Sequence, residues 1–487
     1  MNERPFVLNR RQFFFNRFLD ETYLYRATTR ECTVLTGIAT DLLHLLALAS
    51  MDLPTLTERL NRLLVGQRAT EDVVARAVRE LAALGIVVEA AEPYRTRSIA
   101  PSADLVEHIR ATTTAPYFYT PYAATLFING KCNQKCDFCF LDFDLMRKVH
   151  DALTAEQWVE IIDRLTEAGV FFINIGGMEP LVSFDLTVAI LRRAKAAGCV
   201  LGFITNGSIP LTSEQIEILL DIDAHIGVSL ESHVGGVHDE AVALPRAHER
   251  CVANVEAWVK AGLTVEIQTV AMRRNAGQIP DFVRWLDRLG VASFSLQNVF
   301  GGAWCSGQGF FDMALTPREY GDVVSRLKAL EGELRLGLDW DGFPHERDLT
   351  TVSRYKGHRL EELLQCSAGK TAAYVSPKGD LTPCPVTVAH PEHVVGNILA
   401  KPFMDIWHDT PAFGAFRKYQ ASDYDSPACR SCEQFINCRG GCLVTARAAN
   451  GGFLAGDPRC AKVYERSRPD HRGGSPLIQI QPLRVPA

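Results

Sequence analysis

From about residue 124 the chain alternates short apolar runs with amphipathic segments. The apolar runs predict six buried strands, which read ATLFING, VFFINIG, CVLGFITN, AHIGVSL, TVEIQTVA and ASFSLQNV. Between them apolar residues recur at three- and four-residue spacing, which predicts helices over 155–168, 185–197, 213–220, 247–261 and 279–289. Repeated strand–helix units predict an α/β fold, a TIM-like partial (β/α)6 barrel. Functional groups then lie at the C-terminal ends of its strands.

The first hundred residues follow a different pattern. Aromatic and β-branched runs between residues 13 and 35 predict two or three strands, and helical spacing follows from residue 40 to 84. Gly85 has the position of a helix C-cap, and the run IVVEA after it predicts a short strand. We interpret 1–92 as a winged-helix module and 93–120, which contains several Pro and Thr, as a linker.

Composition narrows the class of protein. The chain has 487 residues, which predicts more than one domain. Its net charge of −6 offers no basic footprint for nucleic acid. The N-terminus lacks the pattern of a signal peptide, and no apolar run approaches the ~20 residues that span a bilayer. We therefore expect a cytoplasmic protein without membrane contact. Fourteen cysteines in such a chain favour metal ligation over disulfides.

One loop carries the strongest chemical signal. KCNQKCDFCF places Cys132, Cys136 and Cys139 directly after the first barrel strand with C-x3-C-x2-C spacing. These thiolates cannot all form disulfides with one another, but they can hold a four-iron cluster and leave one iron without a protein ligand. An incomplete zinc site is the alternative. The spacing, with Phe138 before the last cysteine, resembles the radical S-adenosylmethionine (SAM) superfamily.

The resemblance implies a reaction and a cosubstrate site. SAM would chelate the open iron and be cleaved reductively to methionine and a 5′-deoxyadenosyl radical, which abstracts a substrate hydrogen atom. Motif positions at successive strand ends would contact SAM. After the second strand these are Gly176, Gly177 and Glu179 in IGGMEP, where Met178 interrupts the family's GGEP. After the third strand it is Asn206 in Thr205-Asn206-Gly207. At the end of the fourth strand they are Ser229 and Glu231 in SLE.

A further cysteine follows the sixth strand. Cys305 lies in the glycine-rich run FGGAWCSGQG, at the rim where catalytic groups are expected. Some radical SAM epimerases use a cysteine there as a hydrogen-atom donor, which makes Cys305 a candidate catalytic residue. An incidental small residue is the alternative.

The last third of the chain carries a second cysteine pattern. Cys366, Gly379 and Cys384 are spaced C-x12-G-x4-C around a predicted hairpin, and four more cysteines follow in C-x2-C-x5-C-x3-C spacing before Cys460. The pattern resembles the SPASM domain of radical SAM enzymes that act on peptides and proteins. A zinc ribbon is the alternative for the C-x2-C pair alone.

The SPASM resemblance implies two auxiliary clusters, and so three [4Fe–4S] clusters in all. The ligands of the nearer cluster, here called the first auxiliary set, would be Cys366, Cys384 and Cys442. Those of the other, the second auxiliary set, would be Cys429, Cys432, Cys438 and Cys460. Ala372 stands where many relatives have an eighth cysteine, which predicts an open iron or an unrecognised ligand in the first set. The predicted domains are the barrel at 121–315, a bridging region at 316–365, SPASM at 366–462 and a poorly ordered tail at 463–487.

The N-terminal module is similar to the recognition element of enzymes that modify ribosomally made peptides (RiPPs). There a leader peptide adds a strand to the edge of a three-stranded sheet, beside the third helix. The edge would lie near 32–35 and the helix at 73–84. Winged helices also bind DNA, but the sequence of this third helix, EDVVARAVREL, is not markedly basic.

Together these features resemble radical SAM/SPASM peptide maturases, such as sactisynthases, ranthipeptide synthases and maturases of quinohaemoprotein amine dehydrogenase. The expected function is an oxidoreductase that installs a thioether cross-link in a precursor peptide or small protein subunit bound through its leader. Flavodoxin or ferredoxin is the expected electron donor. The alternatives are epimerisation, carbon–carbon cross-linking or oxidative decarboxylation of a peptide residue. A more distant alternative is an iron–sulfur redox-sensing DNA-binding regulator.

Overall fold

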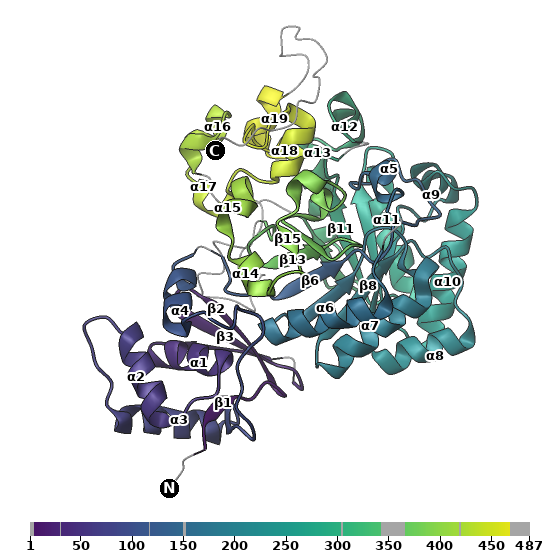
Figure 1. Ribbon diagram of the computed structural model, residues 1–487. Coiled ribbons are helices and arrows are strands. Elements are labelled where there is room, and N and C mark those ends of the chain that lie inside the picture. The colour runs from purple at the N-terminus through teal and green to yellow at the C-terminus, as the bar shows by residue number, and fades with distance from the viewer. Residues whose placement is uncertain are drawn as a thin grey trace.

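The computed structural model describes residues 4–29, 31–115, 117–149, 152–302, 305–341, 366–417 and 420–467. Of the expected bridging region, 316–365, residues 342–365 lie outside the described residues, as do residues 468–487 of the expected tail, 463–487. Figure 1 shows the N-terminal module in purple, the barrel in blue and teal, and the C-terminal part in green and yellow. Among the described residues, no helix has the length and apolar character needed to cross a membrane.

The core of the molecule is a ten-stranded sheet with the order β12-β11-β10-β9-β8-β7-β6-β13-β14-β15. Its six predicted strands are confirmed and run parallel; they are β6 (Ala123–Leu126), β7 (Phe172–Ile175), β8 (Val200–Thr205), β9 (His225–Ser229), β10 (Val265–Ala271) and β11 (Ser293–Asn298). The strand β12 (Gly337–Trp340), which we did not predict, adds to β11 in parallel. The curved parallel sheet agrees with a partial barrel.

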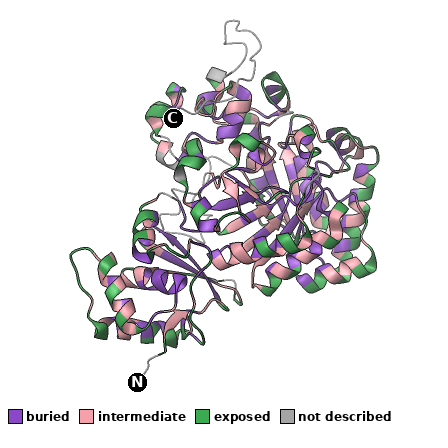
Figure 2. Ribbon diagram, viewed as in Figure 1, coloured by how far each residue is buried: buried purple, intermediate pink, exposed green. Residues whose placement is uncertain are grey.

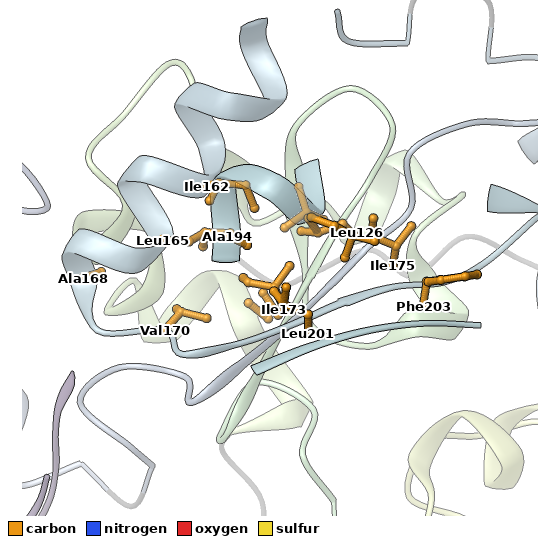
Figure 3. Packing of buried hydrophobic residues seen from close by; sticks show 14 of the residues in the cluster. Leu126, Ile162, Leu165, Ala168, Val170, Ile173, Ile175, Ala194, Leu201 and Phe203 are labelled. Atoms are coloured by element: carbon orange, nitrogen blue, oxygen red, sulfur yellow. The ribbon is translucent and has the colours of Figure 1, made fainter. Parts of the chain in front are cut away.

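Helices cover the outside of this sheet. The five predicted helices are α6 (Ala155–Ala168), α7 (Phe184–Ala196), α8 (Ser213–Ile222), α10 (Ala247–Ala261) and α11 (Ile279–Leu289). The remaining helical segments of the barrel region are α5 (Phe143–Met146), η1 (Pro180–Ser183), α9 (Gly235–Val242), η2 (Ala276–Gln278), α12 (Gln308–Met313) and α13 (Pro317–Lys328). In Figure 3, Leu165 of α6 and Ala194 of α7 lie over Ile173 in the sheet. Their outer faces are exposed, as Figure 2 shows.

The N-terminal module has the predicted order of elements. Its strands are β1 (Phe6–Leu8), β2 (Phe13–Phe18), β3 (Glu21–Arg26), β4 (Glu31–Thr36) and β5 (Val87–Glu89), and its helices are α1 (Ile38–Leu48), α2 (Leu53–Leu63) and α3 (Glu71–Ala83). Strands β2, β3 and β4 form an antiparallel sheet, and β5 pairs with β1. The helix that packs on β4 is α1, while α3 packs on α2 and β5. The winged-helix assignment itself stays a prediction.

The segment 93–120, which we interpreted as a linker, has secondary structure and buried side chains of its own. It contains α4 (Leu105–Thr113), and Tyr117, Phe118 and Tyr119 are buried. The backbone N–H of Tyr119 donates to the Arg17 carbonyl at 2.8 Å, along the outer edge of β2. The aromatic side chains explain the difference, because their burial joins the module to the rest of the protein.

The cysteine-rich part continues the barrel sheet. Its elements are β13 (Ala372–Val375), β14 (Asp380–Thr382), β15 (Gly396–Asn397), α14 (Phe403–Trp407), α15 (Thr410–Phe413), α16 (Pro427–Arg430), α17 (Phe435–Cys438), α18 (Leu443–Asn450) and α19 (Ala461–Ser467), with short 3-10 turns between them. Strands β13 and β14 form the predicted hairpin, and β13 pairs in parallel with β6. Contrary to the expected poorly ordered tail, Val463 is buried in α19.

Candidate active site

A cavity of about 300 Å³ lies at the C-terminal ends of the barrel strands. Most of the barrel site residues expected from sequence line it; they are Cys132, Cys136, Cys139, Phe138, Gly176, Gly177, Asn206, Ser229 and Glu231. Two expected residues, Glu179 and Cys305, do not line it. The motifs that follow successive strands therefore meet in one place, as the barrel topology predicts.

The three loop cysteines interact closely. Burial raises the pKa of the Cys136 thiol well above its ordinary value, and the charges of Cys139 and Cys132 raise it further. Burial likewise raises the pKa of Cys139 to about 11. Holding all three as thiolates therefore requires a positively charged partner such as a metal centre.

The donor set fits a cluster better than a single ion. Across the described ranges, no three His, Cys, Asp or Glu side chains converge tightly enough to hold one metal ion. A cubic four-iron cluster binds its thiolates at separate corners, so it needs a wider spacing than one zinc ion. Three thiols around a shared cavity suit the cluster.

Gln134 is a cavity residue that sequence reasoning missed. Its side chain is 4% exposed and lines the cavity. Its Nε2 is buried and has no hydrogen-bond partner in the part of the chain that the structure describes. Its place in the sequence between Cys132 and Cys136 is the only feature that could have indicated a role in this site. A buried amide donor without a partner fits a site that is completed by a ligand.

Glu179, at a motif position whose backbone is expected to contact SAM, does not line the cavity, and the expected contact stays a prediction. Its carboxylate is fully buried and accepts hydrogen bonds from Thr205 Oγ1 at 2.8 Å, the Asn206 N–H at 2.8 Å and the Leu181 N–H at 2.9 Å. Burial raises its pKa, although these hydrogen bonds act in the opposite direction. Glu179 therefore ties the loop after β7 to the end of β8.

Asn206 connects β8 to the cysteine loop. Its Nδ2 donates to Asn133 Oδ1 at 2.7 Å and lies 3.9 Å from the sulfur of Cys132. Its Oδ1 accepts from the backbone N–H of Ser208 at 2.9 Å. Because its polar atoms are already engaged, Asn206 positions the loop that carries the thiols.

The glycine pair Gly176–Gly177 lets the backbone approach the ring of Phe127 closely. Gly177 has φ +101°, and a Cβ atom there would lie 2.2 Å from the ring of Phe127. Met178, which interrupts the expected motif, is buried and lines the cavity beside it. The inserted residue thus contributes an apolar wall.

Glu231 is the only carboxylate among the described cavity-lining residues. It is 1% exposed, and one oxygen accepts from the Val270 N–H at 2.8 Å. Burial raises the pKa of Glu231 to about 8, against the lowering effect of that hydrogen bond. Ser229 lies two residues earlier, at the end of β9.

Cys305 does not line the cavity. It is fully buried and packs near Phe310, with its sulfur 3.9 Å from that of Met313. Burial raises the pKa of its thiol to about 12. The structure therefore does not bring this thiol to the position expected of a hydrogen-atom donor.

The other seven motif cysteines fall into two groups of neighbours. Burial raises the pKa of the Cys384 thiol, and the charges of Cys442 and Cys366 add to the effect. Burial likewise raises the thiol pKa of Cys429, Cys438 and Cys460, and charges of other cysteines of this group, Cys432 among them, add to the effect. These neighbour relations match the two auxiliary sets, whose role as cluster ligands stays a prediction.

Comparisons with known proteins agree with this architecture. The model of the radical SAM superfamily matches residues 126–286, and that of SPASM, an iron–sulfur cluster-binding domain, matches residues 366–433. The mycofactocin maturase MftC of Mycobacterium ulcerans is 29% identical over 376 residues, which cover 73% of this chain and 95% of that protein. The PqqA peptide cyclase of Streptomyces rochei is 26% identical over 388 residues, which cover 76% of this chain and 97% of that protein.

A solved structure shows the same fold. Streptococcus suis SuiB bound to its precursor peptide SuiA aligns with a TM-score of 0.68 at 17% identity, covering 92% of this chain and 98% of that one. The two domain matches, with the cavity that joins the cysteine loop to the motif-bearing strand ends, show that the chain contains a radical SAM domain and a C-terminal SPASM domain.

Proposed function

We propose that this enzyme is a maturase that cross-links a ribosomally made precursor peptide or small protein subunit. The observation that carries the proposal is the cavity itself, because residues of the SPASM part, Tyr374 and Pro385, line it together with the cysteine loop. Two relatives are named a maturase and a peptide cyclase, and SuiB was solved with a precursor peptide.

We assign different roles to the residues that line the cavity. Cys132, Cys136 and Cys139 would hold the SAM-binding cluster, which when loaded supplies the electron for SAM cleavage. Asn206 fixes the loop that carries them, while Gln134 offers an unused amide donor to the cosubstrate. Phe138 and the other aromatic lining exclude water, which protects a radical from side reactions.

The N-terminal module offers one edge for an added strand. The outer edge of β2 is covered, because the Tyr119 N–H bonds to Arg17 and the backbone carbonyl of Thr120 accepts from Asn16 Nδ2 at 2.5 Å. Strand β4 pairs with β3 on one side, and Cys32 and Thr33 are exposed. A leader peptide would add to β4 through backbone hydrogen bonds, next to α1 and not next to the predicted third helix.

The bond that we propose is a thioether. The first auxiliary set supplies three cysteines where many SPASM relatives have four, because Ala372 stands at the remaining position. An open iron there would bind a substrate thiolate. A carbon–carbon cross-link is the second candidate, since one of the relatives is named a peptide cyclase. The buried position of Cys305 weighs against the epimerase alternative.

The first test is the anaerobic content of iron and sulfide, with mass analysis of SAM products after reduction by dithionite. About twelve irons per chain and release of 5′-deoxyadenosine are expected for three four-iron clusters. Reaction with a synthetic precursor encoded beside the gene should then remove two hydrogen atoms from the peptide. Blocking of its cysteine against alkylation distinguishes a thioether from a carbon–carbon bond. Zinc in place of iron, with SAM unchanged, contradicts the proposal.

Peptide recognition has a separate test on the full chain. Neighbouring residues of an edge strand direct their N–H groups alternately toward the sheet and toward solvent. In the variants Thr33→Pro and Val34→Pro, we expect one to weaken binding of the fluorescent precursor without a change in Tm, while the other destabilises the module. Tight binding of duplex DNA with no peptide binding would favour the regulator alternative.

A further inference from the structure

A second cavity lies between the N-terminal module and the barrel. Its volume is about 520 Å³, and its module wall includes Phe13 of β2 and Leu48 of α1. Ala168, where α6 ends, and Ala196, where α7 ends, belong to its barrel wall. Figure 1 shows the module beside the end of α6. This module–barrel cavity shares no lining residue with the cavity of the candidate active site, so the site already described does not account for it.

The module–barrel cavity carries an excess of positive charge. Five cationic side chains and two carboxylates line it, although the whole chain has a net charge of −6. The charged lining residues are Arg10, Arg11, Arg97, Arg193, Lys195, Asp163 and Glu167. Both carboxylates are already paired, Glu167 with Arg97 and Asp163 with Arg193. Lys195 pairs with Asp221, which does not line the cavity. Two guanidinium groups are left over.

These two groups, on Arg10 and Arg11, have no carboxylate partner in the described part of the chain. Nη1 of Arg10 donates to the Glu167 carbonyl at 2.6 Å, and Nη2 donates to the Ala47 carbonyl. Its guanidinium also lies 4.9 Å from the centre of the Tyr94 ring. Arg11 is exposed beside it. Carbonyl oxygens hold Arg10 in place without neutralising it, so the two fixed positive charges attract an anion to the cavity.

The cavity opens at one end of the sheet that carries the proposed leader edge. Phe13 pairs with Arg26, and Arg26 pairs with Glu31, the first residue of β4, so the three lie in one row across the sheet. A strand added outside β4 would lie three strand spacings from Phe13, about 14 Å. About five extended residues span that distance. A peptide that pairs with β4 and continues past Glu31 can therefore reach the cavity.

We propose that the module–barrel cavity binds an acidic stretch of the precursor peptide, adjacent to the segment that pairs with β4. The inference rests on the proposed function, in which a leader peptide adds to that edge. Carboxylates of the peptide would pair with Arg10 and Arg11, and the rings of Phe13 and Tyr94 would cover its apolar stems. Backbone pairing on β4 accepts many sequences, whereas this cavity selects for negative charge at a fixed distance from the paired segment.

The test measures fluorescence anisotropy on the full-length chain, with labelled hexaglutamate as the probe and hexaglutamine as its neutral counterpart. Arg11→Glu reverses a charge on the module wall. Ala196→Glu adds a negative charge on the barrel wall, and both positions are exposed. Arg68→Glu is the matched control, because Arg68 is an exposed arginine of the same module that does not line the cavity. Tm of each variant confirms that it is folded.

We expect the parent to bind hexaglutamate and not hexaglutamine. Each cavity variant should weaken this binding by about fivefold or more, while Arg68→Glu stays within about twofold of the parent. No binding of hexaglutamate, equal weakening in Arg68→Glu, or no effect of either cavity variant overturns the inference. Displacement by an equal concentration of inorganic phosphate indicates a small-anion site and overturns it as well. So does tighter binding of duplex DNA at the same residues.

The labelled precursor encoded beside the gene separates this inference from the proposed function. Arg11→Glu should weaken its binding, and exchange of the precursor's Glu and Asp for Gln and Asn should remove the effect of Arg11→Glu. If the precursor binds and is modified but responds to neither change, the inference fails and the proposed function stands. If the parent neither binds nor modifies the precursor, the proposed function fails, and the inference with it.

Discussion

The carboxylate of Glu179 accepts the backbone N–H of Asn206 at 2.8 Å inside the barrel rim. The bond crosses from the loop after β7 to the end of β8. Asn206 in turn reaches Asn133 in the cysteine loop at 2.7 Å. The side chain of Glu179, a motif residue expected to contact the cosubstrate, therefore acts indirectly. Through Asn206 it holds the loop that carries the thiols.

Replacement of Glu179 tests this relationship. Glu179→Gln keeps the shape of the side chain but places an amide donor among groups that already donate. We expect a loss of about 1–3 kcal/mol in unfolding free energy, because a buried donor is left unsatisfied. SAM binding measured by calorimetry should weaken as well. Glu156→Gln on the exposed face of α6 is the control, and equal stability of the two variants would contradict this role.

The glycine pair offers a second test. Gly177→Ala combines a positive φ with a Cβ position 2.2 Å from Phe127, so we expect a loss of about 1–3 kcal/mol from overpacking and strain. Gly236→Ala in α9 has no atom within 4 Å of the added methyl and should be neutral or slightly stabilising. Denaturant unfolding measures both. If Gly177→Ala matches the control, the backbone geometry at the cavity is wrong.

Removal of a first-set cysteine should separate SAM cleavage from product formation. In Cys384→Ala we expect the iron content to fall by about four per chain, on the basis of a four-iron cluster. 5′-Deoxyadenosine should still form, because the cysteine loop is intact, while the cross-linked peptide should be absent. Iron assay and mass spectrometry of the two products check this. Normal cross-linking would show that the first set is not required.

Cys305 should not be required for SAM cleavage or for peptide modification. Its sulfur is buried beside Met313 and does not line the cavity. Cys305→Ala should therefore retain both SAM cleavage and peptide modification within a few-fold, with a stability cost of about 1–2 kcal/mol for the lost core volume. A variant that cleaves SAM normally but leaves the peptide unmodified would restore Cys305 as a hydrogen-atom donor.

Buried histidines predict a loss of stability in acid. Burial lowers the pKa of His108 to about 4 and that of His44 well below its ordinary value. Below pH ~6.5 the unfolded chain binds protons that the folded chain does not, so stability falls as the pH falls from there toward 4. His108→Gln should flatten this dependence in urea unfolding between pH 4 and 7. His225→Gln, at an exposed position, should leave it unchanged.

Six parallel strands of the barrel, the five helices between them and the cysteine motifs are predictable from the sequence alone. Helical and strand periods are local, and each amphipathic segment, such as α6, buries the side that its own spacing defines. Ligand spacing within one loop is equally local, so Cys132, Cys136 and Cys139 were assigned before any fold was known. Once a parallel barrel is predicted, its topology alone brings the strand-end motifs together.

How side chains from distant segments are used follows from the folded chain and not from local sequence. Glu179 turns toward Thr205 instead of the cavity, Cys305 packs into a separate core, and β13 joins the barrel sheet beside β6. The buried ion pair of Asp457 and Arg459, in which Nη2 lies 2.7 Å from Oδ2, likewise has no signature in the sequence. These outcomes depend on non-local packing, in which each buried polar group must find a partner that the sequence order does not reveal.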